Sequence, residues 1–374
     1  MNDDKKPEIR FKEFTDTWEQ RKLGEIAERF DNLRIPVAAN LREKGDIPYY
    51  GANGIQDYVK GYTHKGEYIL VAEDGANDLK NYPVQYVNGE IWANNHVHVL
   101  QSKSINNKFL KYVISQTDIK SLLVGGGRSK LNANIMMDII IKIPINVDEQ
   151  NKIGELFYNL DNLITLHQRK YDKLVNIKKA MLDKMFPKNG KNVPEIRFRG
   201  FTDAWEQRKA KELCLISTGK SNTQDKVDNG KYPFYVRSDI IEHSNKYLYD
   251  EEAVITVGDG VGTGKVYHYV KGKYDLHQRC YRCYGFSTKI DAKYFYYYFS
   301  THFYNRVMMM TAKTSVDSVR LDMIADMDIN FPDIKEQRLI SNYLDSLDNL
   351  ITLHQHKLEK LKNVKKSVLD RMFV

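Results

Sequence analysis

The nine-residue stretch LDNLITLHQ occurs twice in the chain, at residues 160–168 and again at residues 347–355. The two copies are separated by half the length of the 374-residue chain, so the stretch holds the same place in each half. Self-similarity at a fixed period indicates that each half is one structural unit, and missing it would misread the whole fold. The repeat therefore decides the fold: the chain contains two units of equal length.

The repeat extends outward from this stretch in both directions, always with the same offset. Residues 160–186 return at 347–373 with 19 of 27 positions identical. PEIRFKEFTDTWEQRK at 7–22 returns as PEIRFRGFTDAWEQRK at 194–209, with 13 of 16 identical. Between these matched ends, roughly at 23–148 and 210–335, the halves diverge almost completely. A shared frame around two different interiors predicts two heads that recognise different things.

The matched C-terminal part of each half has the heptad pattern of a coiled coil. Apolar and semi-apolar residues recur at alternating steps of four and three, with Lys365 at the one missing place in the second copy, and charged residues cover the other faces. About five such heptads predict a coiled-coil helix, ~58 Å long from residue 148 to 186. Two copies in one chain can bury their seams against each other. The seam positions are Ile153, Phe157, Leu160, Ile164, His167, Tyr171, Leu174, Lys178, Met181 and Met185 in the first copy, and Ile340, Leu344, Leu347, Ile351, His354, Leu358, Leu361, Val368 and Met372 in the second.

The stretch FPKNGKNVP at 186–194 is expected to end the first helix and act as a hinge, because its prolines and glycine break a helix. The heptads alone are equally well explained by a tandem duplication whose helices only hold a scaffold. That explanation leaves open why the ends stayed alike while the interiors diverged.

Length and composition limit the class of protein. A chain of this length suggests two or more domains, and 42% apolar residues suffice for real cores. Lys and Arg outnumber Asp and Glu by 57 to 49, a net charge of +8 that makes an anionic partner plausible. No stretch approaches the ~18 apolar residues of a membrane span, and the first residues do not form a secretory signal. Three cysteines do not make a disulfide framework, so we expect a cytoplasmic protein.

The interiors have the pattern of mixed α+β domains. The stretches at 67–76 and 251–265 are apolar runs that end in glycine turns, and those at 90–100 and 273–286 alternate as later strands do. NNKFLKYVISQ and DAKYFYYYFSTHFYNRVMM have helical spacing. The tyrosines of residues 294–298 could stack on bases, but packing in a core is the expected role.

Several catalytic and metal sites are excluded by their motifs. VGDGVGTGK at 257–265 has Asp259 where a phosphate-binding loop needs its first glycine, and Val266 where it needs Ser or Thr, while GGGRSK at 125–130 fails the same test. Cys280 and Cys283 form a single CxxC whose thiols would point to opposite faces of a strand, so zinc is not expected. No Asn/Asp-Pro-Pro-Tyr/Phe string of an amino-methyltransferase and no compact nuclease set is present.

The frame resembles the specificity subunit of Type I restriction-modification enzymes. The resemblance is carried by PEIRF..FTD.WEQRK at the start of each half, by EQNKIGELFYNLDNLITLHQ and EQRLISNYLDSLDNLITLHQ at the start of the helices, and by DKMF and DRMF at their ends. It covers nearly the whole chain and reproduces the order of head, helix, head and helix. It implies an α+β fold with two globular α/β target-recognition domains held apart by two long antiparallel coiled-coil helices, with a pseudo-two-fold axis from the tandem repeat. The expected domains are residues 1–148, the helix at 149–186, a linker with the second head at 187–335, and the helix at 336–374.

The resemblance also implies a function and partners. Each head would read one half of a split sequence in double-stranded DNA, and the helices would set the spacer and dock two methyltransferase subunits. Motor-nuclease subunits would be added for restriction and host defence. No cofactor is expected in this chain, because S-adenosylmethionine, ATP and Mg²⁺ would belong to the partner subunits. The chain itself is expected to be non-catalytic, and no membrane partner is expected.

Arg, Lys, Asn and Gln on polar loops are the expected DNA contacts, because Arg and Lys pair with guanine edges, Asn and Gln with adenine, and further basic residues with phosphates. An ordinary solvated surface residue is the competing explanation for each one. The candidates are Lys80, Asn81, Asn94, Asn95, Arg128, Lys130 and Asn132 in the first head, and Lys220, Asn222, Arg237, Arg279, Arg282, Lys313 and Arg320 in the second.

The sequence thus favours a DNA-recognition subunit over two alternatives. One is a self-contained DNA-modifying enzyme, which the missing catalytic motifs disfavour. The other is a coiled-coil interaction scaffold with protein-binding heads. Salt-dependent DNA binding, whose slope counts neutralised phosphates, separates the scaffold from the DNA-recognition subunit.

Overall fold

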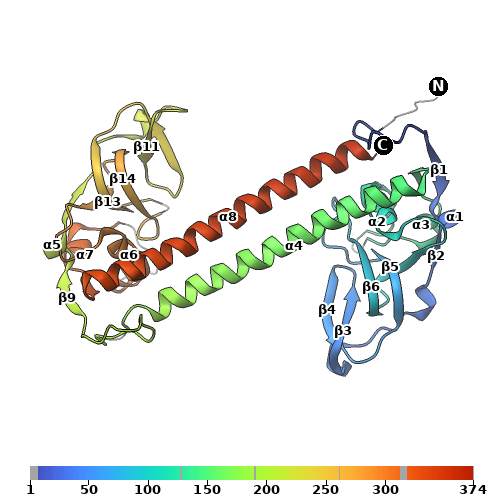
Figure 1. Cartoon of the computed structure of the whole chain (residues 1–374), viewed down its shortest axis with the longest axis horizontal. Helices are drawn as coiled ribbons and strands as arrows, with labels where there is room; N and C mark the ends of the chain where they lie inside the picture. The colour runs from blue at the N-terminus through green and yellow to red at the C-terminus, as the bar shows by residue number, and fades with distance from the viewer. Residues whose placement is uncertain (1–6, 127–128, 189–190, 261, 312–317, 374) are drawn as a thin grey trace. The chain divides into compact units, whose positions relative to one another are not determined.

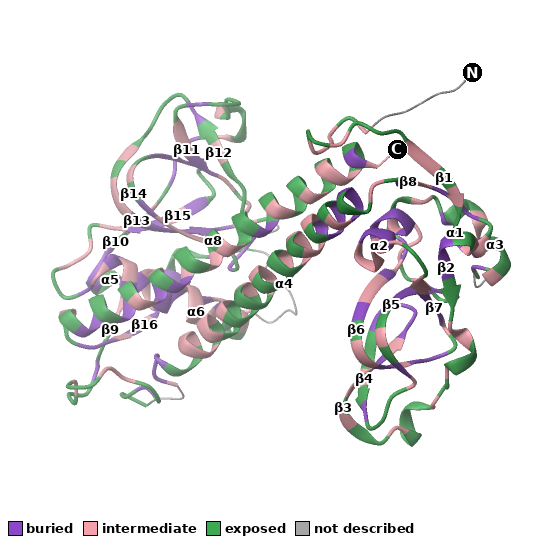
Figure 2. Cartoon of the chain, turned by 45° about the vertical axis from the view of Figure 1, so that its right-hand side comes forward, coloured by how far each residue is buried: buried purple, intermediate pink, exposed green. Residues whose placement is uncertain are grey.

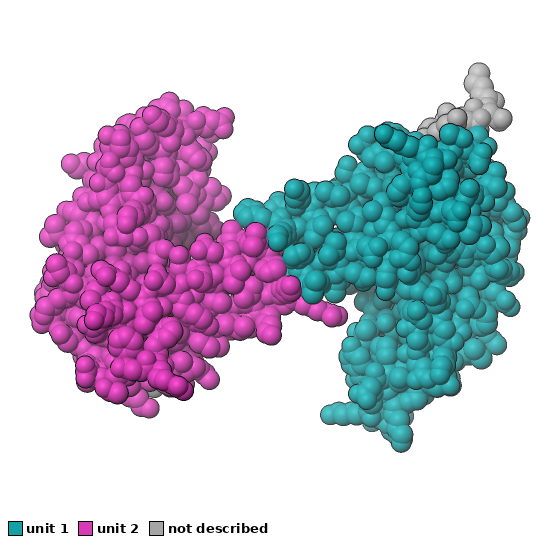
Figure 3. Space-filling view, in the orientation of Figure 1, with its two compact units in different colours: residues 1–168, 356–374 teal, residues 169–355 magenta. Residues whose placement is uncertain are grey.

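The computed structural model describes residues 7–126, 129–188, 191–260, 262–311 and 318–373. The chain divides into two compact units, which Figure 3 shows in different colours. Unit 1 comprises Met1–Gln168 and His356–Val374, and unit 2 comprises Arg169–Gln355. Each unit therefore contains one head and one end of each long helix.

Two long helices, α4 (Val147–Lys184) and α8 (Ile334–Met372), run through the regions with the heptad pattern. Asn146 and Asp333 hold equivalent positions in the two halves of the repeat. Each accepts a hydrogen bond of 2.8 Å from the backbone N–H two residues later and so caps the helix start. The boundary between the units falls after Gln168 in α4 and after Gln355 in α8. The repeated stretch therefore ends where one unit gives way to the other along each helix.

Unit 1 contains a two-stranded and a six-stranded sheet (Figure 1). The small sheet pairs the strand at the end of the shared N-terminal segment with the last strand before α4, so it joins the start of the head to its end. The strands are β1 (Trp18–Lys22), β2 (Ala27–Arg29), β3 (Lys44–Gly51), β4 (Gly54–Val59), β5 (His64–Ala72), β6 (Val84–Ala93), β7 (Val97–Ser102) and β8 (Ile140–Pro144). The helices are α1 (Leu23–Ile26), α2 (Asn107–Gln116) and α3 (Ala133–Met137), with 3-10 turns η1 (Asp31–Leu33), η2 (Ala39–Leu41) and η3 (Lys120–Leu122).

Unit 2 repeats this arrangement with different residues. The strands are β9 (Glu206–Lys209), β10 (Leu215–Thr218), β11 (Tyr232–Tyr235), β12 (Ile241–Ser244), β13 (Tyr249–Val257), β14 (Tyr267–Leu276), β15 (Cys280–Tyr284) and β16 (Asp328–Phe331). The helices are α5 (Ala210–Leu213), α6 (Ala292–Met310) and α7 (Leu321–Ala325), with the 3-10 turn η4 (Thr223–Asp225).

The two six-stranded sheets have the same topology. Their orders are β2-β7-β5-β6-β3-β4 and β10-β15-β13-β14-β11-β12. In each sheet one pair, β3 with β6 and β11 with β14, is parallel and the other pairs are antiparallel. The divergent interiors are therefore two versions of one fold. The predicted fold class, with two mixed α/β heads in tandem and two long helices, is confirmed.

Most strands and helices expected from the interiors occur, but the stretches at 90–100 and 273–286 are not single strands. Residues 94–96 separate β6 from β7, and residues 277–279 separate β14 from β15. The apolar runs that end in glycine turns are β5 and β13, and the helical stretches are α2 and α6. Tyr294, Tyr297 and Tyr298 are buried in the core of unit 2, which confirms packing as their role. Cys280 and Cys283 lie in different apolar clusters, as expected for opposite faces of β15.

Within unit 1 the start of α4 lies beside the end of α8. Asp161 of α4 pairs with Lys365 of α8 at 2.5 Å, and Phe157, one turn earlier in α4, contacts Phe373, which directly follows α8. The two helix ends are therefore antiparallel in this unit. In unit 2, Lys178 and Asp348 form the equivalent ion pair, because they are the repeat counterparts of Lys365 and Asp161.

The shared N-terminal segments seat on the helices by equivalent contacts. Arg10 makes two hydrogen bonds, of 2.6 and 2.7 Å, to fully buried Glu149 in unit 1. Arg197 makes two of 2.8 Å to fully buried Glu336 in unit 2. Each copy of the segment therefore neutralises a buried glutamate at the equivalent position of its own half.

Candidate nucleic-acid interface

In the first head, charged residues from four loops meet beyond one end of the six-stranded sheet. Glu73, which directly follows β5, accepts hydrogen bonds of 2.6 Å from Arg34 and 2.7 Å from Lys130. Burial raises the pKa of Glu73, but the hydrogen bonds from Lys130 and Arg34 outweigh it and leave that pKa below its ordinary value. The charged carboxylate thus ties the loop after η1 and the loop before α3 to the end of β5.

Two histidines extend this group along the edge of β7. His96 precedes β7 and pairs with Asp74, the second residue after β5. The buried His98 has both ring nitrogens within hydrogen-bond distance of an oxygen, with Asp31 at 2.8 Å and the carbonyl of Leu131 at 3.0 Å. The loops are therefore held in place by polar contacts while their outer residues remain exposed.

In the second head, Asp259 lies between two arginines. Its carboxylate oxygens are 3.5 Å from Arg237 and 3.6 Å from Arg279, and these two side chains are 48% and 64% exposed. Arg279 also lines an open hollow of about 430 Å³ together with Gln278, Tyr281 and neighbouring residues. Two planar cations and an amide thus face solvent at the end of the sheet.

A buried layer fixes the backbone beneath these side chains. The Ser221 hydroxyl donates to Asp275 at 2.6 Å, and the backbone N–H of Arg279 donates to Nδ1 of His277 at 3.0 Å. Burial first, and then the charge of Arg237, lowers the pKa of His277, which keeps that nitrogen available as an acceptor. The Gln278 amide in turn donates to Asn222. The loop before β15 is consequently a rigid platform.

The two groups occupy equivalent places in the two heads. Asp74 and Asp259 are each the second residue after the matching strand, β5 or β13. His96 and Arg279 each directly precede the matching strand, β7 or β15. Each aspartate also forms an isolated bridge to the loop before the last small helix. One carboxylate position is therefore common to both heads, while the side chain beside it differs, histidine in the first head and arginine in the second.

The structure brings some of the sequence-predicted residues together and separates others. Lys130, Arg237 and Arg279 belong to the groups above, with Asn95 exposed next to His96 and Asn222 next to Gln278. Lys80 and Asn81 lie in the loop after β5, where both backbone N–H groups donate to Asp78. Asn132 caps α3, Lys220 is exposed beside the platform, and Arg320 pairs with Asp322 at the start of α7.

Two predicted residues are used inside the fold. Asn94 is buried and accepts a hydrogen bond from the backbone of His96. Arg282 is buried in β15, where it pairs with Glu251 and lies over the rings of Tyr249 and Tyr284. Their burial leaves little surface for DNA. Arg128 and Lys313 lie outside the described residues.

Sequence reasoning missed Arg34, Glu73, Asp74, His96 and Asp259. A signal was available, because Glu73, Asp74 and Asp259 lie within two residues of the end of an apolar strand and His96 directly precedes one. Polar residues at such positions from neighbouring strands meet at one edge of a sheet. Arg34 had no comparable signal, because it lies in an irregular loop after η1.

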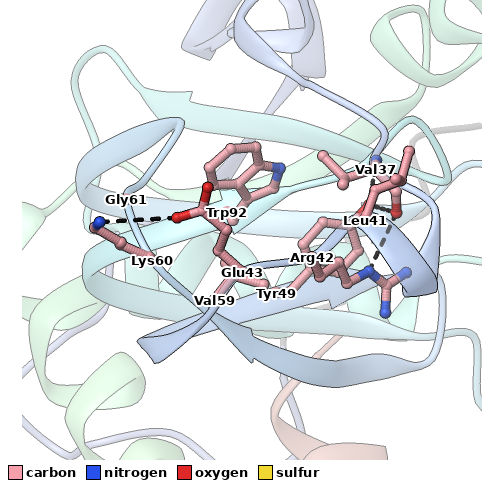
Figure 4. A pocket seen from close by; sticks show the side chains of 9 residues that line it. All are labelled: Val37, Leu41, Arg42, Glu43, Tyr49, Val59, Lys60, Gly61 and Trp92. Atoms are coloured by element: carbon pink, nitrogen blue, oxygen red, sulfur yellow. Dashed lines mark hydrogen bonds and ion pairs between the residues drawn. The ribbon is translucent and has the colours of Figure 1, made fainter.

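A cavity of about 390 Å³ lies beside the β3–β4 hairpin of the first head (Figure 4). The Arg42 guanidinium lies 4.1 Å from the centre of the Tyr49 ring and donates to the Val37 carbonyl at 3.1 Å, and Lys60 pairs with Glu43 at 3.7 Å. Arg42 is thus engaged by the Tyr49 ring and the Val37 carbonyl, while Lys60 and Glu43 form a separate, exposed pair.

The long helices carry a further surface feature outside the seam. Leu163 and Leu166 in α4 are 43% and 46% exposed, and Leu350 and Leu353 in α8 have the same two values. All four belong to the repeated stretch, so each unit has one exposed leucine pair. The seam positions named above are buried or partly buried, and Figure 2 shows exposed faces along both helices.

The described part of the chain has no group of three or more His, Cys, Asp or Glu side chains arranged to hold a metal ion. None of its helices has the length and apolar character needed to cross a membrane.

Comparison with known proteins gives a consistent result over most of the chain. The family described as "Type I restriction modification DNA specificity domain" matches twice, at residues 15–176 and 202–363. A putative type I restriction enzyme specificity subunit of Haemophilus influenzae is 31% identical over 359 residues, which is 89% of this chain and 88% of that protein. The MjaVIII specificity subunit of Methanocaldococcus jannaschii is 24% identical over 398 residues, covering 94% and 91%.

A solved structure has the same fold. The S subunit of a Type-I restriction-modification system from M. genitalium superposes with a TM-score of 0.73 over 99% of each chain, at 13% identity. The likeness extends through both heads and both long helices.

Proposed function

The chain belongs to the Type I restriction-modification DNA specificity family, and on that basis we propose that each of its heads reads one half of a split DNA sequence. The chain is a specificity subunit with two DNA-recognition domains. The observation that carries the proposal is the repeated frame: the same ion pairs recur in each half and support two heads whose loops differ. Two different loop sets on one fold suit two different half-sites.

The loops at the sheet ends are the proposed DNA-reading surfaces. They present arginine, lysine, asparagine and glutamine side chains, the residue types that pair with guanine and adenine edges in the major groove. The net charge of +8 favours association with the phosphate backbone. Lys130 in the first head and Lys220 in the second are suited to phosphate contact, because they are exposed on these loops.

The exposed leucine pairs are the proposed docking sites for two methyltransferase subunits. Leu163 with Leu166, and Leu350 with Leu353, are too exposed to serve the seam and have identical neighbours in sequence. Two identical partner subunits need two identical surfaces. Substituting serine for both leucines of one pair is expected to remove one methyltransferase subunit from the complex, and substituting all four is expected to remove both. Native mass spectrometry measures this stoichiometry.

In this proposal the chemistry belongs to the partners. S-adenosylmethionine would bind the methyltransferase subunits, and ATP and Mg²⁺ would bind motor-nuclease subunits where these are present. The chain would contribute recognition and spacing. The helices are proposed to set the number of unread base pairs between the half-sites.

The testing experiment is methylation mapping. The chain is assembled with its methyltransferase subunits, given S-adenosylmethionine and genomic DNA, and the methylated adenines are located by sequencing. Two short conserved sequences at a fixed distance are the expected result. A single continuous site, or methylation without sequence preference, would contradict the proposal. Methylation or cleavage of DNA by the purified chain alone would favour a self-contained enzyme. DNA binding that does not depend on salt concentration would favour a protein scaffold.

A further inference from the structure

We propose that Arg237 and Arg279, oriented by Asp259, read a guanine in the half-site of the second head, and that His96, oriented by Asp74, holds the corresponding position in the first head. This inference rests on the proposed function, because it assigns residues to the reading of a half-site. The two heads carry different side chains beside the shared aspartate, and we infer that this makes them prefer different bases.

The geometry of the second head distinguishes base reading from backbone binding. A phosphate contact needs positive charge, and a carboxylate placed between two arginines reduces it. Asp259 therefore reduces the positive charge that a phosphate clamp requires, while it lies within ion-pair distance of one nitrogen of each guanidinium. Reading guanine needs a planar donor fork in a fixed orientation, because O6 and N7 accept two parallel hydrogen bonds. An orienting carboxylate suits that task.

The backbone under Arg279 is held as a reading site requires. The N–H of Gly258 donates to the carbonyl of Arg279 at 2.8 Å, and the N–H of Arg279 donates to His277. A Cβ on Gly258 would lie 2.5 Å from that same carbonyl, so the close approach requires glycine. Side chains that discriminate must be positioned by their neighbours to within fractions of an ångström. Asp259 follows Gly258 directly, so the carboxylate and the arginine share one rigid support.

The amide beside the arginines extends the reading surface by one step. Gln278 is exposed, adjoins Arg279 in sequence and donates to the side chain of Asn222. Amide side chains pair with adenine. The loop therefore offers an arginine and an amide to neighbouring base pairs.

The first head repeats the arrangement with other chemistry. Asp74 pairs with His96 where Asp259 pairs with Arg279, and both aspartates bridge to the loop before the last small helix. A histidine is shorter than an arginine and lacks the planar fork. We therefore expect the two heads to prefer different bases at this equivalent position.

The test uses the full chain and a pool of random DNA duplexes, from which bound molecules are selected and sequenced. The wild-type chain defines two half-sites. Arg279→Gln is expected to reduce the preference for one G·C pair in one half-site by about tenfold or more, and to leave the other half-site unchanged. His96→Gln is expected to alter the other half-site only. Arg208→Gln is the matched control, because Arg208 is a part-exposed arginine paired with Glu206 in the frame of unit 2.

Asp259→Asn separates positioning from charge. Removing the carboxylate makes the site more positive, so overall affinity for DNA should rise or stay level while discrimination at the same G·C pair falls. Thermal melting of each variant checks that it folds.

Each other outcome contradicts the assignment in a recognisable way. If Arg279→Gln weakens binding equally for all sequences and lowers the salt slope by about one, Arg279 contacts phosphate. If the selected motif is unchanged, Arg279 does not read DNA. If the wild-type chain selects no motif at all, the proposed function fails and this assignment fails with it.

Discussion

Lys178 and Lys365 stand at seam positions, where the other residues of the two helices are apolar or semi-apolar. In the sequence they interrupt the heptad pattern, and only the structure explains them, because each pairs with an aspartate of the other helix. Asp161 additionally accepts hydrogen bonds from Tyr112 at 2.6 Å and Lys111 at 3.2 Å. One carboxylate thus connects two helices and a head.

The Lys111 ammonium gives unit 1 a stability that depends on pH. Burial lowers the pKa of Lys111 to about 8, against the opposing effect of Asp161. Below pH 8 both the folded and unfolded states hold the proton, and the cost of burying the charge is fully present. Between pH 8 and 10.5 the unfolded state binds more protons, so the free energy of unfolding rises with pH. Relative to Lys111→Met, the wild-type chain should gain up to about 3 kcal/mol over this window.

Urea titrations of both chains at intervals from pH 7 to 10.5 measure this difference. A constant difference across the window would mean that Lys111 keeps an ordinary pKa in the folded chain. The same titrations of Lys293→Met provide a control, because Lys293 pairs with Asp345 at a more exposed place in unit 2.

The buried Arg197–Glu336 pair should be expensive to break from one side. Arg197→Met leaves the fully buried Glu336 without its two hydrogen bonds, which should lower the free energy of unfolding by about 3–5 kcal/mol. Changing both residues, as in Arg197→Met with Glu336→Gln, should recover most of that loss. Chemical denaturation of the single and double variants checks both statements. Equal losses in the two variants would show that packing, and not the buried charge, sets the cost.

At the scale of elements, the long helices could be predicted from the sequence. The residues against which their ends pack could not. The heptads predict the seam because apolar periodicity is local information. That the end of α8 packs in unit 1, with Phe373 against Trp18 and Phe109, depends on contacts between distant residues. The candidate DNA contacts were predicted only in part for the same reason. The sequence shows the residue types, but the burial of Arg282 and Asn94 depends on tertiary contacts that it does not show.

The length of the helices should determine the spacing of the half-sites. Four residues inserted after Asn176 would separate Leu174 from Ile177 and Met181, which pack together against the core of unit 2. Matched insertions after Gln168 in α4 and after Gln355 in α8 avoid this, because both positions are unit boundaries. Each helix would lengthen by ~6 Å and rotate by about 40°. Because B-DNA rises by ~3.4 Å per base pair, we expect one or two extra spacer pairs.

Methylation of a DNA library with varied spacers, by the complex that contains the double insertion, measures the change. The half-site sequences should stay the same, since no head residue is altered. An insertion in α4 alone is the control, and it should lose stability because it shifts the seam by a stutter. An unchanged spacer with activity retained would mean that the helices only dock partners.

At the scale of the whole molecule, the heads should be exchangeable. Replacing residues 23–143 with the interior of another specificity subunit leaves the shared segments and both helices intact. Only one half of the recognised sequence is then expected to change, because the other head keeps all its loops. Methylation mapping of the chimera and the parent checks this, and a change in both halves or in neither would contradict modular reading.

A tyrosine on α2 or α6 that bonds to a long helix restricts which heads fit the shared frame. The Tyr112 hydroxyl reaches Asp161, and the Tyr297 hydroxyl reaches Asp348 at 2.9 Å, although α2 and α6 share little sequence. In terms of inheritance, the near-identical segments that flank each interior are suited to recombination between related genes, which would deliver a new head in one step. An incoming head whose helix lacks this hydroxyl would bring a new DNA preference, but it would be attached less firmly to the shared segments and long helices. Selection on such genes should therefore let the loops vary while it retains the tyrosine that bonds to the helix aspartate in each head.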